Sequence, residues 1–221
     1  MAAKKKTPSK SPAPKAARGK AATKPAAKVA AKVVIPAEPS DEMDSAERNA
    51  SYEKGKWAHA FKRADGEIRY WLVKTEPDIF GFDDLLRRHG RTTCWDGVRN
   101  YAARNFLRDA MKMGDKVLFY HSMTDEQCIV GECEVAREGY VDHTAFDPKH
   151  RHFDRESKQD DPQWYMVDLR ATAQYTTPVT LEQIKRKAVL KDMVLIRIPR
   201  LSVIPVTDKE YKTVRAMAGE K

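Results

Sequence analysis

The sequence has few cysteines, no long apolar run and none of the short motifs of several common enzyme classes. Its three cysteines form no C-x-x-C pair and cannot all be bridged, which excludes a disulfide scaffold and indicates a reducing compartment. No apolar run approaches the ~20 residues that a membrane-spanning helix needs. H-E-x-x-H, P-loop and G-x-G-x-x-G motifs are absent. We therefore expect no membrane span, no cofactor and no metal.

The positive charge of the chain is unevenly distributed. The sequence holds 41 Lys and Arg against 32 Asp and Glu, a formal net charge of +9. Ten of the basic residues and only one acidic residue, Glu38, fall within residues 1–40, so the rest is formally neutral with 31 of each sign. The same 40 residues contain 12 Ala, six of the 12 Pro and no aromatic residue. This composition is typical of a disordered segment.

We expect this basic tail to act as a non-specific tether to nucleic acid or as a nuclear-import signal, because clustered positive charge attracts phosphate backbones. A solubilising extension without a dedicated partner is the alternative. We divide the chain into a disordered tail and linker (1–51), a partly ordered lead-in (52–69) in which Trp57 and Phe61 cover an edge of the domain, and a folded domain (70–221). The predicted tether residues are Lys4, Lys5, Lys6, Lys10, Lys15, Arg18, Lys20, Lys24, Lys28 and Lys32.

Apolar periodicity predicts the elements of the folded part. The helix over 100–112 has the clearest pattern, and Thr180 is expected to cap a helix that follows it. Irregular alternation of strands and helices does not suit a βαβ array, and predicts an α+β fold: a mixed sheet or small barrel of about six strands with helices packed outside. The predicted strands are 70–75, 117–121, 129–135, 164–171, 194–198 and 201–206, the last two as a hairpin about Pro199-Arg200, and the predicted helices are 82–88, 100–112, 180–187 and 208–217.

A dense polar and aromatic motif, CWDGVRNY at 94–101, leads into the best predicted helix. Its Asp-Gly pair predicts a turn that delivers a helix N-terminus, where unpaired backbone N–H groups attract anions. Arg99 and Arg104 add positive charge, and the rings of Trp95 and Tyr101 are suited to stacking on a base. The alternative is that both rings belong to the core and the arginines form surface ion pairs. The residues alone leave both interpretations open.

Polar side chains also collect at the ends of two predicted strands, in KTEP at 74–77 and YHS at 120–122, where pockets commonly form. Enzymatic alternatives are weaker. Cys94 with His121 lacks the local signature of a cysteine hydrolase. The long loop 139–163 is expected to fold over the rim of a pocket, with Phe146, Phe153 and Trp164 as anchors. Its Asp142-His143, His150, His152 and Asp154 are weak evidence for a metal site.

Five segments together carry a family resemblance: YWLVKTEP, TTCWDGVRNYAARNFLRDAMKMGD, VLFYHS, DHTAFDP and WYMVDLR. In order and spacing they resemble EVE-domain proteins of the PUA-like superfamily, close to the thymocyte nuclear protein family. The resemblance covers about 70–208. It implies a small mixed β-barrel with helices outside, and a reader that holds a modified or flipped base in an aromatic pocket. Modified cytosine in DNA is favoured and RNA is possible.

Matching the motifs position by position implies a set of site residues. Thr75 stands where the family commonly has Ser, which keeps the hydroxyl and adds a methyl group. We expect a monomer that is not an enzyme, nuclear in a eukaryote, or cytoplasmic or nucleoid-associated in a bacterium. An enzyme acting on a modified nucleotide and a methyl-lysine-binding module are the alternatives. The implied base-pocket residues are Lys74, Thr75, Glu76, Trp95, Asp96, Val98, Arg99, Asn100, Tyr101, Tyr120, His121 and Ser122, and the implied backbone-binding residues are Arg104, Asn105 and Arg108.

Overall fold

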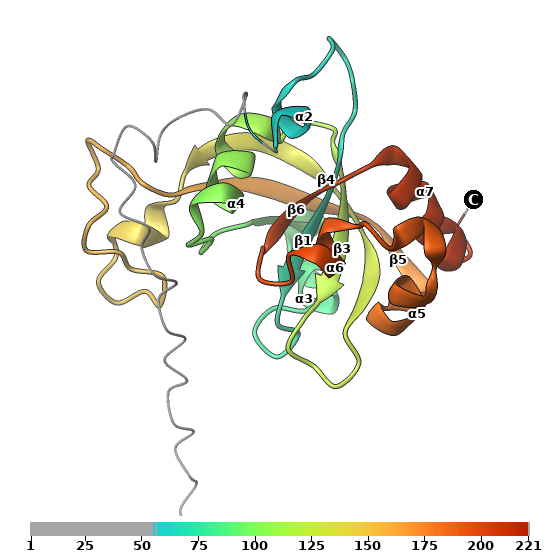
Figure 1. The fold of residues 1–221 in the computed structure, drawn as a ribbon. Coiled ribbons are helices and arrows are strands. Elements are labelled where there is room, and N and C mark those ends of the chain that lie inside the picture. Colours follow the sequence, from blue (N-terminus) through green and yellow to red (C-terminus); the bar gives the residue numbers. More distant parts are fainter. Residues whose placement is uncertain (1–54, 56, 221) are drawn as a thin grey trace, which may run out of the picture. The chain divides into compact units, whose positions relative to one another are not determined.

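The computed structural model describes residue 55 and residues 57–220 (Figure 1). The predicted basic tail and linker (1–51), with the ten tether residues, and residues 52–54 and 56 of the lead-in lie outside these described residues. The domain boundaries placed after residues 51 and 69 stay predictions. All three cysteines are free. Within the described part of the chain, no helix is long and apolar enough to cross a membrane.

Six strands form one mixed sheet in the order β2-β5-β4-β3-β1-β6. Neighbouring strands are antiparallel except for β1 and β3, which run parallel and are paired from Tyr70 with Lys116 to Thr75 with His121. The predicted α+β class, a mixed sheet of about six strands with helices packed outside it, is confirmed. The strands are β1 (Tyr70–Thr75), β2 (Thr92–Cys94), β3 (Lys116–His121), β4 (Cys128–Val141), β5 (Tyr165–Thr180) and β6 (Val203–Val206).

The helices are short and pack around this sheet (Figure 1). Two of them begin with a capping box, in which Thr180 pairs with Gln183 and Thr207 with Glu210, so the predicted Thr180 cap is confirmed. The α-helices are α2 (Ala58–Phe61), α3 (Phe82–Arg87), α4 (Tyr101–Asn105), α5 (Leu181–Arg186), α6 (Val194–Arg197) and α7 (Asp208–Met217); the other helical turns are η2 (His89–Arg91), η3 (Phe106–Ala110, a π-helix), η4 (His143–Phe146) and η5 (Ala188–Leu190).

The predicted hairpin about Pro199-Arg200 is wrong. Residues Val194–Arg197 form α6, and Val203–Val206 form β6, which pairs antiparallel with β1. A short apolar run such as VLI fits a buried helical turn as well as a strand, so periodicity could not separate the two. The sequence prediction also missed β2, whose three residues are too few to show a pattern. Strands β4 and β5 extend well beyond their predicted ends, into stretches with more exposed residues.

The alternation of side chains along β1 and β3 divides the sheet into two faces. Trp71 packs against Phe106 of η3 at 5.6 Å between ring centroids, whereas the neighbouring Tyr70 packs against Tyr211 of α7 at 4.5 Å. We call these the α4 face and the α7 face. Because paired strand residues share a face, Val73 and Phe119 lie on the α4 face. This division decides which of the predicted site residues can meet.

The lead-in packs on the α4 face. Trp57 is only 5% exposed and meets Phe106 edge to face at 5.4 Å, and Phe61 lies 5.7 Å from the same ring. The carboxylate of the fully buried Asp115, just before β3, accepts hydrogen bonds from the two terminal guanidinium nitrogens of Arg63 at 2.7 and 2.6 Å. A buried carboxylate therefore fastens the segment after α2 to the sheet.

Candidate nucleic-acid interface

The carboxyl ends of β1 and β3 bring three predicted site residues together. Ser122 donates through its backbone N–H at 2.8 Å and its hydroxyl at 3.1 Å to the carbonyl oxygen of Thr75. The hydroxyl of Thr75 donates to the carbonyl oxygen of Phe80 at 2.9 Å. Both hydroxyl protons are thus engaged, and the hydroxyl oxygens keep acceptor capacity. The side chain of Glu76 is exposed at the same edge.

His121 is paired with Thr75 and lies on the α4 face, 5.8 Å from the Phe119 ring. Its Nε2 accepts the backbone N–H of Phe82, the first residue of α3, at 3.2 Å. Burial lowers the pKa of His121, and the nearby carboxylate of Asp83 offsets this only in part. A neutral imidazole therefore holds the start of α3 against the end of β3.

This contact predicts an acid-sensitive stability. Since the folded state disfavours the proton on His121, the unfolded state takes it up first, and stability is lost as the pH falls from the ordinary value of 6.5 through the lowered pKa. Urea unfolding near pH 7 and near pH 5 should show a smaller loss for His121→Gln than for the unchanged chain. His89→Gln, at an exposed histidine, should retain the full loss. An unchanged pH dependence in His121→Gln would contradict this assignment.

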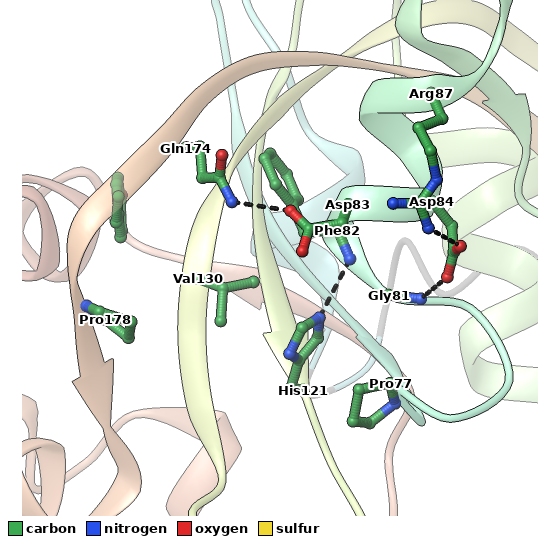
Figure 2. Close-up of a pocket in the computed structure, with 11 residues that line it drawn as sticks. Pro77, Gly81, Phe82, Asp83, Asp84, Arg87, His121, Val130, Gln174 and Pro178 are labelled. Atoms are coloured by element: carbon green, nitrogen blue, oxygen red, sulfur yellow. Dashed lines mark hydrogen bonds and ion pairs between the residues drawn. The ribbon is translucent and has the colours of Figure 1, made fainter. Parts of the chain in front are cut away.

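A cavity of about 390 Å³ opens beside His121 (Figure 2). This volume is within the range of small-ligand sites. Its wall combines the Phe82 ring with the carboxylate of Asp83, which accepts the amide of Gln174 at 3.0 Å. Of the predicted pocket residues, only His121 lines it. The lining residues are Pro77, Gly81, Phe82, Asp83, Asp84, Arg87, His121, Val130, Gln174, Tyr175 and Pro178.

Lys74 and Tyr120 lie on the α7 face, opposite Thr75 and His121. The Lys74 ammonium donates to the carbonyl oxygen of Pro199 at 2.6 Å and stands 5.9 Å from the Tyr120 ring centroid. Burial lowers the pKa of Lys74 to about 8 and raises that of Tyr120 to about 12. A base that lies against one face of the sheet would therefore contact either Lys74 and Tyr120 or Thr75 and His121, but not all four.

The CWDGVRNY motif follows β2 as a turn. Trp95 is 7% exposed and meets Phe119 edge to face at 5.4 Å, and Val98 is also buried. Asn100 caps α4, because its side-chain oxygen accepts the N–H of Ala103 at 3.0 Å. The Trp95 ring thus belongs to the core, which agrees with the structural alternative for this residue. Phe119, which the Trp95 ring contacts, in turn lies 5.8 Å from His121 at the end of β3.

The long loop after β4 covers this turn. Asp142, fully buried, accepts the N–H of Gly97 at 3.0 Å and the Arg99 guanidinium at 2.8 Å. Trp164 stacks on Tyr101 at 5.0 Å, and the Arg99 guanidinium lies 5.2 Å from the centroid of the Trp164 ring. The loop, expected to fold over the rim of a pocket, packs on the CWDGVRNY turn instead, and none of its residues lines the cavity beside His121. Tyr101 and Arg99 therefore both contact other parts of the protein. Arg99 pairs with the buried Asp142, whereas the structural alternative expected surface ion pairs for the arginines.

The three predicted backbone-binding residues lie in α4 and η3. Arg104 and Asn105 are fully buried, and Arg104 donates to the carbonyl oxygen of Gln163 at 2.8 Å. Burial lowers the pKa of Arg104 to about 10. Arg108 pairs with its neighbour Asp109 at 2.7 Å. Burial of Arg104 and Asn105 suits the seating of the helix better than contact with a phosphate backbone.

Cys94 does not have the character of a nucleophile. Burial raises the pKa of its thiol, and the carboxylates of Asp96 and Asp168 raise it further. Since the thiolate is the reactive form, a raised pKa works against the cysteine-hydrolase alternative. Among the suggested loop ligands, Asp142 is occupied by Arg99 and Gly97, and Asp154 accepts the indole N–H of Trp164.

The sequence offered little sign of the cavity. Phe82 and Asp83 were placed in a predicted helix, where Phe82 has the pattern of a core residue, and Gln174 lies in the part of β5 beyond its predicted end. Contacts between residues so far apart in the chain leave no local signature.

Comparison with known proteins identifies the family. The EVE domain model matches residues 69–217. The chain belongs to the EVE domain family. Thymocyte nuclear protein 1 of Homo sapiens is 41% identical over 165 residues, which cover 67% of this chain and 73% of that protein. Its counterpart in Danio rerio is 41% identical over 167 residues, covering 68% and 72%.

Solved structures share the fold of this EVE domain. A hypothetical protein from Leishmania major is 44% identical, with a TM-score of 0.68, over 71% of this chain and 98% of that chain. The human THYN1 protein, in complex with 5-methylcytosine containing DNA, is 39% identical with a TM-score of 0.66 over 69% of this chain and 99% of that chain. The similarity thus extends over nearly the whole of each of these solved chains.

Proposed function

We propose that this EVE domain is a non-enzymatic reader that binds DNA containing a modified cytosine. The observation that carries the proposal is its similarity to the human THYN1 protein, whose structure holds 5-methylcytosine containing DNA. The names of the curated relatives also support a nuclear location in a eukaryotic host.

The cavity beside His121 is the proposed base site. Phe82 bounds the cavity but is only 1% exposed, so it closes the site as a wall and leaves no free ring face for stacking. A carboxylate accepts the exocyclic amine of cytosine, which suits Asp83, and the apolar Val130 and Pro178 suit a methyl group. Taking a base out of a duplex costs a few kcal/mol, which the contacts with Asp83, Val130 and Pro178 would have to offset together with the contacts to the rest of the DNA. Thr75 and Ser122 stand at the neighbouring strand ends.

Titration of the full chain with matched duplexes tests the proposal. Burying one methyl group contributes about 0.8 kcal/mol, so the duplex with 5-methylcytosine should bind about fourfold more tightly than the unmodified one. Asp83→Ala should weaken the binding of both duplexes, since cytosine and 5-methylcytosine carry the same exocyclic amine, and because Asp83 is exposed the fold should tolerate the change. Lys74→Ala, on the opposite face of the sheet, is the matched control and should leave both affinities and their ratio unchanged.

Three outcomes would count against this account. Equal affinity for the two duplexes would remove the preference for the modified base, and tighter binding of modified RNA would change the substrate class. If Lys74→Ala lost the preference and Asp83→Ala had no effect, the base would bind on the α7 face and not in the cavity.

We further propose that the basic tail supplies affinity without sequence preference. Ten cations lie within residues 1–40, whereas the rest of the chain is formally neutral. Deleting residues 1–40 should lower the slope of log affinity against log salt by about 0.9 for each phosphate that the tail had neutralised. The ratio between modified and unmodified duplexes should not change. If the deletion abolished the ratio and left the salt slope intact, the tail would be a reader and not a tether.

A further inference from the structure

Three metal-ligating side chains meet where the long loop crosses the CWDGVRNY turn. Asp96 comes from the turn, and His150 and His152 come from the loop more than 50 residues later. One ligand atom from each lies within 4.8 Å of those of the other two. The Nδ1 of His152 is 3.5 Å from an Asp96 carboxylate oxygen, and the two imidazole centroids are 5.1 Å apart.

The backbone is shaped to bring His152 onto the turn. A Cβ on residue 97 would lie 2.1 Å from Cε1 of His152, so the imidazole occupies space that only a glycine leaves open. Gly97 also has φ of +76°, which a side chain would disfavour. On the loop, the carbonyl oxygen of His152 accepts Nε of Arg99 at 3.1 Å. Two elements distant in sequence are thus held with His152 against Asp96.

The charges around the cluster leave Asp96 available to a cation. The nearby Arg99 is paired with the buried Asp142 at 2.8 Å. The Nδ1 of His152 is buried and makes no hydrogen bond. His150 Nδ1 accepts only a long bond, 3.3 Å, from the N–H of His152, so little is lost if this ring turns toward a metal.

We propose that Asp96, His150 and His152 form a three-ligand site for a divalent transition-metal ion of the Zn²⁺ type, which clips the long loop to the turn. Two imidazoles and one carboxylate are a ligand set that Zn²⁺ accepts, with bonds of about 2.0–2.2 Å. Tetrahedral geometry at these bond lengths separates ligand atoms by about 3.4 Å, close to the distance between His152 and Asp96. A fourth position stays open to water. The loop histidines alone gave weak evidence for a metal; Asp96, from another element, completes the set.

Zinc titration of the full, chelator-treated chain tests the site independently of any DNA binding. Calorimetry should show one Zn²⁺ per chain, and Co²⁺ in its place should give the visible absorption of a tetrahedral complex. His150→Ala should lower the Zn²⁺ affinity at least about tenfold, as should His152→Ala and Asp96→Asn. His89→Ala and His143→Ala are the matched controls, since both histidines are exposed and outside the cluster.

Hydrogen exchange separates the loss of a ligand from the loss of the fold. Zn²⁺ should slow exchange in residues 143–163 of the unchanged chain, and have no such effect in His150→Ala, while the exchange of β1 and β3 stays the same in both. Absence of saturable Zn²⁺ binding by the unchanged chain would overturn the proposal. Equal affinity in His150→Ala, His152→Ala and the controls would overturn it as well.

Discussion

Replacing Asp115 by alanine is expected to lower the free energy of unfolding by about 3–5 kcal/mol, the cost typical of breaking a buried ion pair from one side. The carboxylate is fully buried and binds more than Arg63. It accepts the indole N–H of Trp71 at 2.8 Å and the backbone N–H groups of Arg69 and Lys112 at 2.9 and 3.0 Å. The alanine variant leaves all of these donors without their acceptor.

Urea unfolding followed by tryptophan fluorescence measures this effect. Asp115→Asn keeps the shape and one acceptor oxygen, and should fall between the unchanged chain and Asp115→Ala. Asp125→Ala, at an exposed aspartate, is the matched control and should stay within about 0.5 kcal/mol of the unchanged chain. A decrease below about 1 kcal/mol in Asp115→Ala would show that the lead-in is not fastened through this carboxylate.

Replacing Asp142 by alanine is expected to release the long loop from the turn. Its carboxylate accepts the N–H of Gly97, the Arg99 guanidinium, and both the N–H and the hydroxyl of Thr144. Leaving the buried donors unpaired should cost about 2–4 kcal/mol, because each unsatisfied group carries its desolvation penalty. The fully buried carboxylate is also the group that positions Arg99 over Trp164.

Hydrogen exchange should locate this effect. Asp142→Ala should speed exchange at residues 96–100 and 143–163, and leave β1 and β3 nearly unchanged. Asp147→Ala, which removes a local hydrogen bond with the backbone N–H of Lys149 in the same loop, is the control and should alter only its immediate neighbours. Uniformly faster exchange across the whole sheet in Asp142→Ala would mean that Asp142 supports global stability instead of the loop.

Elements with a strong local pattern could be predicted from the sequence. The aromatic and β-branched run that ends at Pro77 marks β1, and α7 begins after a Thr207 with Glu210 three residues on, a pairing that the structure shows as a capping box. The segment before α7, residues 194–206, could not be predicted in the same way. Whether Val194–Arg197 becomes a helix depends on packing against the sheet, which a run of four residues does not encode.

The site could be predicted only as a set of motifs. The sequence places Lys74 beside Thr75 and Tyr120 beside His121, but consecutive strand residues point to opposite faces. The structure therefore separates each pair, and it buries Trp95 against Phe119. Asp96 and His152 lie close together because of the path of the long loop, and no local sequence pattern predicts this contact. Motif order identified the family, whereas pairing and loop packing decide which side chains meet.

The most direct test of a base site on the α4 face is a crystal structure of the full chain with a duplex containing one 5-methylcytosine. We predict the modified base out of the helix, in the cavity beside His121 and Phe82, with its exocyclic amine toward Asp83. A modified base that stays stacked in the duplex, or one that lies on the α7 face against Lys74 and Tyr120, would contradict the account.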